Sequence, residues 1–347
     1  MSSLMKGTAI LTIGMFLSKV LGLVYIFPFY AIIGQKNVAL YSYAYVPYTI
    51  MLSIAISGAP IAVSKFVAKY NSLGDYASGR KLVKSGLMIM TLTGFVTFLA
   101  LFLLADPIAH LVIKDEEQVF SVSQIAGVIR WISFALIVVP FMSLVRGFFQ
   151  GYDHMEPTAI SQLVEQIIRI IVLLVGAFLV MRVFHGTAQT AISFAVFSAF
   201  IGALAGLIAL WYYWRRLKPE FDLKLKSSVS SGQLSYTSIY KEVITYSIPY
   251  VFVGIANPLF QLVDMLTFNT AMSNIGLAKV SDEYLGMLNF TTQKIVIIPV
   301  MLATGFSMAL VPAITNYYTR KQNGALINAM DKTYQVLLFV TLPAVVG

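Results

Sequence analysis

Long uncharged segments recur along the chain at a length that suits membrane-spanning helices. Four of them contain no charged residue at all: Asn37 to Ser64, Ser85 to Ala105, Gly186 to Trp214 and Val243 to Val263. A helix needs about 20 apolar residues to cross a bilayer core of about 30 Å. Each of these segments is long enough, so each predicts a transmembrane helix.

Four further apolar segments carry one or two charges within them: roughly Thr8 to Ile33, Gln124 to Val145, Thr158 to Met181 and Leu285 to Tyr318. A ninth segment begins near Thr333 and reaches Gly347. The first segment is too long for a signal peptide and lacks a small-residue cleavage site, so it predicts a retained helix. The pattern predicts an all-α polytopic membrane protein with eight full spans and part of a ninth.

The composition excludes several other classes of protein. Of 347 residues, 58% are hydrophobic and 11% are charged, whereas a soluble domain carries about 25% charged residues. A water-soluble enzyme of this length would need polar surface over two domains, which so few charges cannot supply. The chain has no cysteine and only three histidines, far apart in the sequence. We therefore expect no catalytic residues, no metal site and no organic cofactor.

The positive charges favour one orientation in the membrane. With the N-terminus inside, sixteen of the 24 Lys and Arg residues fall in cytoplasmic segments and four in outer ones. The positive-inside rule then predicts a cytoplasmic N-terminus. Because the basic residues are dispersed over several short loops, they form no single patch, and no nucleic-acid partner is expected.

The longest polar stretch, residues 215–241, separates the sixth span from the seventh. It predicts a cytoplasmic linker between an N-terminal six-helix bundle (1–214) and a partial C-terminal bundle (242–347). The second and eighth spans can be superposed in two competing registers, which suggests a parallel repeat of six helices. On that interpretation the chain has two pseudo-symmetric bundles, of which the second is truncated.

Charged side chains inside spans are costly and usually face a cavity or a partner, so they are candidate functional residues. Lys19 lies about 16 Å into the first span and is predicted to face a substrate, with a contact to backbone carbonyls as the alternative. Lys294, in the eighth span, has the same predicted role, with snorkelling to the outer surface as the alternative. Arg130 lies near the outer end of the fourth span, where it is a candidate substrate contact or an interfacial anchor.

The fifth and seventh spans contain the remaining candidates. Glu165 and Arg169 are spaced i, i+4, which predicts a mutual ion pair, with contact to the substrate as the alternative. Asp264 has no partner in its own helix, and Asn257 and Gln261 share its face. A carboxylate with nearby amide oxygens suits Na⁺ or H⁺ and so predicts a coupling-ion site. A salt bridge from Asp264 to Lys294 is the alternative.

Four sequence strings resemble a known family: SKVLGLVY from Ser18, SGAPIAVSKFVAKY from Ser57, RGFFQGYDHMEPTAISQLVEQIIRI from Arg146 and ATGFSMALVPAITNYY from Ala303. They are similar to the polysaccharide-biosynthesis branch of the multidrug/oligosaccharidyl-lipid/polysaccharide exporter superfamily. Within that branch the chain resembles the stage V sporulation protein B type and the MurJ-type lipid II flippases.

The resemblance implies two six-helix bundles around a V-shaped cavity in the bacterial cytoplasmic membrane. It also implies a monomer that moves an undecaprenyl-pyrophosphate-linked glycan, foremost lipid II, to the outer leaflet without covalent chemistry. On this pattern Lys19 and Lys294 correspond to cavity cations and Asp264 to the acid of a cation site. Three alternatives stay open: a flippase for another lipid-linked polysaccharide, a cation-coupled multidrug antiporter and a non-transporting membrane assembly protein.

Overall fold

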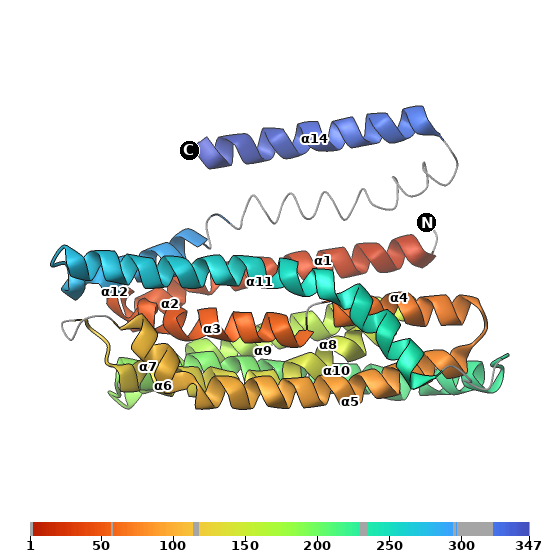
Figure 1. Ribbon diagram of the computed structural model, residues 1–347, viewed down its shortest axis with the longest axis horizontal. Helices are drawn as coiled ribbons and strands as arrows, with labels where there is room; N and C mark the ends of the chain where they lie inside the picture. The colour runs from red at the N-terminus through yellow and green to blue at the C-terminus, as the bar shows by residue number, and fades with distance from the viewer. Residues whose placement is uncertain are drawn as a thin grey trace.

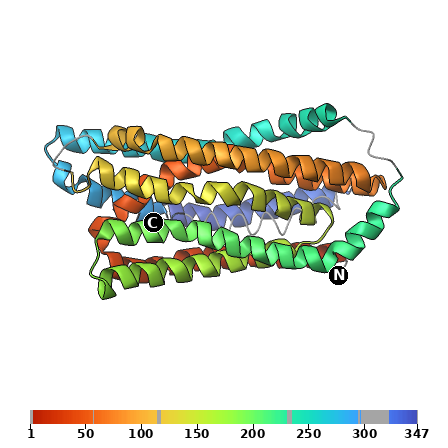
Figure 2. The same ribbon diagram turned by 90° about the horizontal axis from the view of Figure 1, so that it is seen from below.

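The computed structural model describes residues 3–56, 58–113, 118–229, 235–293, 296 and 322–346. Its helices lie lengthwise along one axis (Figures 1 and 2). Within these residues seven helical segments are long and apolar enough to cross a membrane: Ile10–Ile33, Gln35–Ser72, Tyr76–Leu103, Val122–Gly151, Glu156–Val183, Ala188–Lys226 and Thr245–Asn274. They correspond to the first seven predicted spans. Most of the predicted eighth span lies outside the described residues.

Three of the seven spans are each built from two helices. They are α1 (Ser3–Val24) with α2 (Ile26–Ile33), α3 (Val38–Ile56) with α4 (Ala59–Ser72), and α7 (Val122–Ser133) with α8 (Ala135–Gly151). Pro28 has no N–H to bond the carbonyl of Val24, which explains the break at Tyr25. Gly58 precedes α4 with φ of 77°, a left-handed conformation that favours glycine. The breaks let one span change direction within the membrane.

The other helices are α5 (Tyr76–Leu103), α6 (Ala105–Val112), α9 (Glu156–Phe178), α10 (Ala188–Lys226), α11 (Tyr236–Asn274), α12 (Ala278–Gly286) and α14 (Asn323–Val346). Short turns η1 (Gln35–Asn37), η2 (Leu179–Val183) and η3 (Met287–Thr292) adjoin them. Asp75 caps α5 by accepting a hydrogen bond from the Ser78 N–H, and Ser121 and Gln124 form a capping box on α7. α14 begins at Asn323, ten residues before the predicted start of the ninth span at Thr333.

Much of the predicted linker is helical. α10 continues to Lys226 and α11 begins at Tyr236, so only residues 227–235 lie between the two helices. Phe221 anchors the α10 extension, since it is fully buried with its ring centroid 4.7 Å from that of Tyr152 and 5.1 Å from that of Phe148. We name the end of the molecule near residues 65–84, 215–229 and 235–245 the linker end. The opposite end, near residues 34–38, 104–113, 118–120 and 275–286, is the far end (Figure 1).

The Gly202–Gly206 pair lets α10 pack directly on α9. A Cβ atom on Gly202 would lie 2.7 Å from the carbonyl oxygen of Glu165, and one on Gly206 would lie 3.1 Å from that of Ser161. Small residues allow such backbone approach in membrane bundles. The glycine pair thus packs two helices of the same chain and fixes the part of α9 that carries Glu165 and Arg169.

Candidate functional site

A wide cavity of 800 Å³ lies between α4 and α11 at the linker end. Three lysines contribute to its wall: Lys65 and Lys69 from α4, and Lys241 from α11. Its other lining residues are Phe66, Thr245, Tyr246, Pro249 and Tyr250, so no described lining residue is acidic. We name this cavity the lysine vestibule. Its volume is within the range of ligand-binding pockets.

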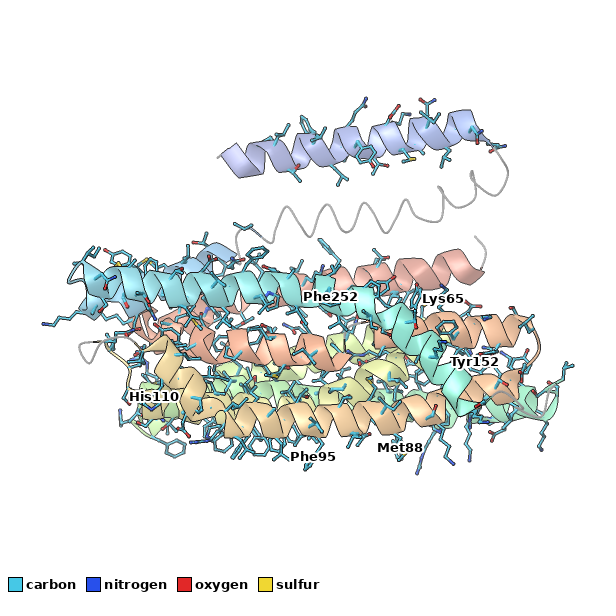
Figure 3. The ribbon with its side chains drawn as sticks, viewed as in Figure 1. Lys65, Met88, Phe95, His110, Tyr152 and Phe252 are labelled. Carbon is cyan, nitrogen blue, oxygen red and sulfur yellow. The ribbon has the colours of Figure 1, made fainter. Side chains whose placement is uncertain are left out.

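Aromatic rings hold the lysines of the vestibule. The Lys65 ammonium lies 4.0 Å from the ring centroid of Tyr246, and the Lys69 ammonium lies 5.6 Å from that of Phe66. Figure 3 shows Lys65 where α11 passes α4. Cation–π contacts are attractive but leave the positive charge in place. Three cations that share one cavity repel one another, so an anion between them would be bound favourably.

A second cationic position lies deeper in the first bundle. The Arg169 guanidinium of α9 donates a hydrogen bond of 3.2 Å to the Tyr41 hydroxyl of α3 and lies 5.7 Å from the ring centroid of Tyr45. Tyr41 and Tyr45 are stacked with centroids 5.3 Å apart. Among the described residues no carboxylate forms an ion pair with Arg169. The tyrosines therefore hold a guanidinium whose charge no acid in the described chain neutralises.

The predicted ion pair between Glu165 and Arg169 is wrong. Glu165 pairs instead with Arg146 of α8, with 2.7 Å between guanidinium nitrogen and carboxylate oxygen. Arg146 also donates from Nε to the Ser161 hydroxyl at 2.7 Å. α8 lies close enough for Arg146 to reach Glu165, while Arg169 turns toward α3. Spacing along one helix could not reveal this competing partner.

The other predicted substrate contacts lie apart from one another. Lys19 is exposed on α1 and makes no hydrogen bond or ion pair with any described residue. Arg130 of α7 pairs with Asp106 of α6 and lies 5.8 Å from the ring centroid of Phe102. That neighbourhood at the far end supports the interfacial-anchor alternative for Arg130. Lys294 lies outside the described residues, so its salt bridge to Asp264 stays a prediction.

The predicted coupling-ion residues all lie on α11. Asp264 and Asn257 are exposed and Gln261 is half-buried. The Asp264 carboxylate has no hydrogen bond or ion pair within the described part of the chain. A free carboxylate is what an ion site requires, but nothing in the structure brings the amides of Asn257 and Gln261 into contact with it.

A buried polar network closes the far end. Asp282 of α12 is fully buried and accepts hydrogen bonds from the Tyr43 hydroxyl, from the Val119 N–H at 2.8 Å and from the Gln118 amide at 3.3 Å. Asn269 of α11 donates to the Tyr43 hydroxyl at 3.0 Å and to the Val112 carbonyl at 3.1 Å. We name these residues the Asp282 latch. The latch joins the first bundle to α11 and α12, whereas at the linker end the described residues of α4 and α11 line the open lysine vestibule.

Sequence reasoning missed the residues that define both ends. It counted three of them, Lys65, Lys69 and Lys241, only among the basic residues of the cytoplasmic segments. Asp282 lies between the seventh and eighth predicted spans and was not a candidate. One local signal was present, because Tyr246 and Tyr250 are spaced i, i+4 shortly after Lys241 and form an aromatic face. The partners of Asp282 are up to 239 residues away in sequence, so no local signal could identify that site.

The motifs and the helical bundle agree with a family match. The model of a family described as "Polysaccharide biosynthesis protein" matches residues 4–318. The chain belongs to this family. Family membership and the seven apolar helices identify it as a multi-pass membrane protein.

Two relatives from Bacillus subtilis (strain 168) match almost the whole chain. "Lipid II flippase MurJ" is 44% identical over 348 residues, which cover 100% of this chain and 64% of the relative. "Stage V sporulation protein B" is 26% identical over 329 residues, which cover 92% of this chain and 59% of the relative. The chain therefore spans about three fifths of the length of these relatives. The sequence-based resemblance to both types is confirmed.

Solved transporters share the fold at low sequence identity. An inward-facing multidrug resistance MATE family transporter of the MOP superfamily has a TM-score of 0.70 with 11% identity, covering 98% of this chain and 68% of that one. An outward-facing transporter of the same description has a TM-score of 0.61 with 13% identity, covering 98% and 71%. The predicted exporter fold is thus confirmed, and these comparisons carry the fold alone.

Proposed function

We propose that this protein moves a lipid-linked oligosaccharide pyrophosphate, foremost lipid II, from the inner to the outer leaflet by alternating access. The observation that carries the proposal is the lysine vestibule: three cations without a lining acid, at the end of the molecule opposite a closed polar latch. The 44% identity to the lipid II flippase supports the same substrate class. The protein makes and breaks no covalent bond, and no organic cofactor takes part.

The vestibule suits a pyrophosphate headgroup. Lysine ammonium groups bind phosphate as point charges without requiring the fixed fork of arginine. Lys65 and Lys69 lie on α4 and Lys241 on α11, so a bound pyrophosphate would bridge the two halves of the chain. The polyprenyl tail would stay in the bilayer. Binding energy would then favour the arrangement in which both halves contact the headgroup.

The linker end is cytoplasmic in this proposal, and so is the N-terminus. Sixteen Lys and Arg residues in the segments of that side support this orientation through the positive-inside rule. The protein would act as a monomer in the bacterial cytoplasmic membrane, with membrane lipid and its substrate as partners and no nucleic acid.

The candidate residues divide into two groups by role. Lys19 and Lys294 would receive the headgroup along its path, while Arg169 in its tyrosine surroundings is a further anion-binding position. Asp264, with Asn257 and Gln261, would bind the coupling ion, Na⁺ or H⁺, whose gradient resets the empty carrier. If no ion binds there, the membrane potential acting on the bound charges would instead shift the equilibrium between the inward-open and outward-open states.

Two rival functions make different demands on the same cavity. A multidrug antiporter exports cations and therefore requires acidic cavity residues, but the described lining of the vestibule carries three lysines and no acid. A non-transporting assembly protein would not depend on the charge of the vestibule at all. A flippase for another lipid-linked polysaccharide would share the site, since pyrophosphate is common to these substrates, and only the glycan would differ.

The decisive experiment measures lipid II at the outer surface of cells depleted of their own flippase. Cells expressing this protein should expose lipid II, and the triple variant Lys65→Gln, Lys69→Gln, Lys241→Gln should lose most of that exposure. Lys218→Gln is the matched control, because Lys218 is exposed at the linker end but does not line the vestibule. No lipid II exposure from a protein that is present in the membrane would overturn the proposal.

Two single substitutions refine the roles within the same assay. Lys19→Ala should abolish flipping and Lys19→Arg should retain it, because charge at this depth is needed and no described residue neutralises it. Asp264→Asn should weaken transport and remove its dependence on sodium or on the proton gradient, because a neutral amide cannot balance a cation. Unchanged ion dependence in Asp264→Asn would assign Asp264 to a structural role instead.

A further inference from the structure

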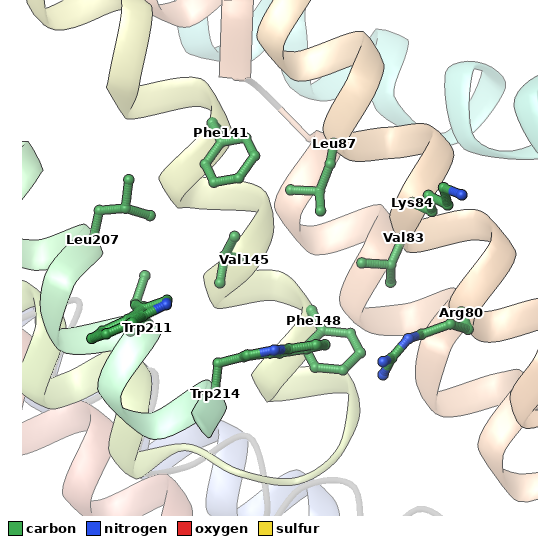
Figure 4. A pocket seen from close by; sticks show the side chains of 11 residues that line it. Arg80, Val83, Lys84, Leu87, Phe141, Val145, Phe148, Leu207, Trp211 and Trp214 are labelled. Carbon is green, nitrogen blue, oxygen red and sulfur yellow. The ribbon is translucent and has the colours of Figure 1, made fainter. Parts of the chain in front are cut away.

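A second cavity, separate from the lysine vestibule, lies between α5, α8 and α10 at the linker end. It has a volume of 340 Å³ and shares no lining residue with the vestibule. Its walls are apolar and aromatic, with Leu207, Trp211 and Trp214 from α10 facing Val145 and Phe148 from α8 (Figure 4). Among its described lining residues, the charged ones are Arg80 and Lys84 of α5.

The cavity opens onto the side of the bundle that faces lipid. On α5, Met88 is 77% exposed and Leu92 63% exposed, and they continue the line of the helix from Lys84 toward the far end. On α10, Ile208 is 65% exposed beside the cavity residue Leu207. In a membrane bundle such exposed apolar side chains contact acyl chains. The occupant of the cavity would therefore come from the bilayer.

The polar end of the cavity has an unused hydrogen-bond donor. The Arg80 guanidinium lies 4.7 Å from the ring centroid of Trp214, and its Nη2 is 3.7 Å from the Asp222 carboxylate. Its Nη1 is buried and has no hydrogen-bond partner among the residues that the structure describes. Buried donors are rarely left unsatisfied, because an unpaired donor keeps the full cost of losing its hydration. A missing acceptor at this position is what a bound phosphate would supply.

The charges around the mouth of the cavity are mainly positive. Lys84 is exposed one helical turn beyond Arg80, and the Arg215 guanidinium covers the face of Trp211 at 3.9 Å from the ring centroid. Asp222 is the one acid paired with them in the described chain. Tryptophans and basic residues at this height are typical of the interface between headgroups and acyl chains.

We propose that this cavity, the α5–α10 groove, binds an anionic glycerophospholipid of the inner leaflet. The headgroup phosphate contacts Arg80 and Lys84, and one acyl chain lies between α5 and α10 against Leu207, Phe148 and Trp211. The apolar walls offer no hydrogen bonds to a glycan, so the groove is not a site for the transported oligosaccharide. The bound lipid completes the hydrogen bonding of Arg80 and fills the space between the two helices.

The test measures lipid binding by the purified protein and does not depend on flipping. Spin-labelled phosphatidylglycerol should bind saturably and more tightly than spin-labelled phosphatidylcholine. The Arg80→Gln, Lys84→Gln double variant should weaken phosphatidylglycerol binding about 10- to 30-fold, since each basic residue near a membrane surface contributes about 1 kcal/mol. Lys226→Gln, which changes an exposed lysine of α10 outside the groove, should bind phosphatidylglycerol as the parent does.

A second variant tests the acyl-chain position without touching the charges. Leu207→Trp should fill the groove and weaken binding while Arg80 and Lys84 remain. Unchanged affinity in either this variant or the double variant would overturn the proposal. The proposal would also be overturned if inorganic phosphate displaced phosphatidylglycerol and bound with the same affinity as the lipid, because the site would then bind a free anion. Since the assay reads binding alone, a failure of the flippase proposal would leave this result intact.

Discussion

The two ends of the molecule hold their polar groups in opposite ways. At the far end, a fully buried carboxylate, Asp282 of the second half, accepts hydrogen bonds from three groups of the first half, on Tyr43, Gln118 and Val119. At the linker end, three lysines share a cavity of 800 Å³ without an acid in its described lining. A buried network with all its hydrogen bonds formed stabilises the contact between the two halves of the chain. Exposed like charges contribute little to stability, and an anionic ligand would reduce their repulsion. In the proposed function, the far end would be the closed gate and the linker end the binding mouth.

The largest expected effect comes from breaking the far end. Asp282→Ala leaves the Tyr43 hydroxyl and the Val119 N–H without their acceptor, which should destabilise the closed latch by about 3 kcal/mol. The chain has no cysteine, so Ala278→Cys in the buried start of α12 provides a single reporter. Maleimide labelling of Cys at this position should become about 100-fold faster.

Glu283→Ala is the matched control for the latch, because Glu283 is adjacent but only half-buried and forms none of the latch hydrogen bonds. Its labelling rate should stay within a few-fold of the parent. Equal labelling rates in the Asp282 and Glu283 variants would show that the latch does not hold the far end closed.

The next effect lies between the two ends, where Gly58 approaches α11. A Cβ atom at Gly58 would lie 2.9 Å from both the Cα and the carbonyl oxygen of Ser247, and φ at Gly58 is 77°. Gly58→Ala should lower the free energy of unfolding by about 2–3 kcal/mol through left-handed strain and this clash. Gly276→Ala has a similar φ of 75° with nothing within 4 Å, so it isolates the strain. If thermal unfolding shows equal losses for the two variants, the halves are not in close contact at Gly58.

A smaller effect should separate the partners of Glu165 in the middle of the bundle. A double-mutant cycle between Glu165 and Arg146 should give a coupling free energy of about 1–3 kcal/mol, since either single change strands a partly buried charge. The same cycle between Glu165 and Arg169 should be additive within about 0.5 kcal/mol. A larger coupling in the second cycle would restore the ion pair expected from sequence spacing.

The smallest effect on stability should come from the linker end. Replacing Lys65, Lys69 and Lys241 by Gln should change the free energy of unfolding by less than about 0.5 kcal/mol per residue, because the interactions of exposed cations are weak in water. Thermal unfolding of the purified protein checks this. A loss as large as that of Asp282→Ala would mean that the lysines hold the halves together, and the comparison between the ends would fail.

The positions of the spans along the chain could be predicted from the sequence, because lipid requires long apolar helices. The boundaries were less accurate where helices leave the apolar region. Hydropathy ends the sixth span at Trp214, yet α10 continues to Lys226 because Phe221 packs into an aromatic cluster below Phe148 and Tyr152. Likewise α5 begins at Tyr76, nine residues before the apolar run, where Asp75 caps it. Aromatic packing determines where α10 ends and a helix cap determines where α5 begins, and hydropathy measures neither.

The candidate site was predictable only in part. Depth within a span singled out Lys19 and Asp264, whose predicted roles stay predictions, and neither side chain has a hydrogen bond or ion pair in the described chain. It could not assign Glu165 to Arg146, because the two residues lie on different helices. Nor could it find the vestibule, since Lys65 and Lys241 come together only when α11 packs beside α4. Contacts between helices distant in sequence carry this information.

The segment between α10 and α11 limits how far the two halves can travel. Its first residues are fastened to the first bundle, because the Val229 N–H donates to the Gly74 carbonyl at 3.0 Å and the Ser228 hydroxyl accepts from the Ala77 N–H at 3.1 Å. Six peptide units join Val229 to Ser235, and their covalent length is at most about 20 Å. While both anchors hold, the start of α11 is confined to a sphere of that radius around Val229. Opening one gate and closing the other must therefore keep the start of α11 within that distance of Val229 at every stage.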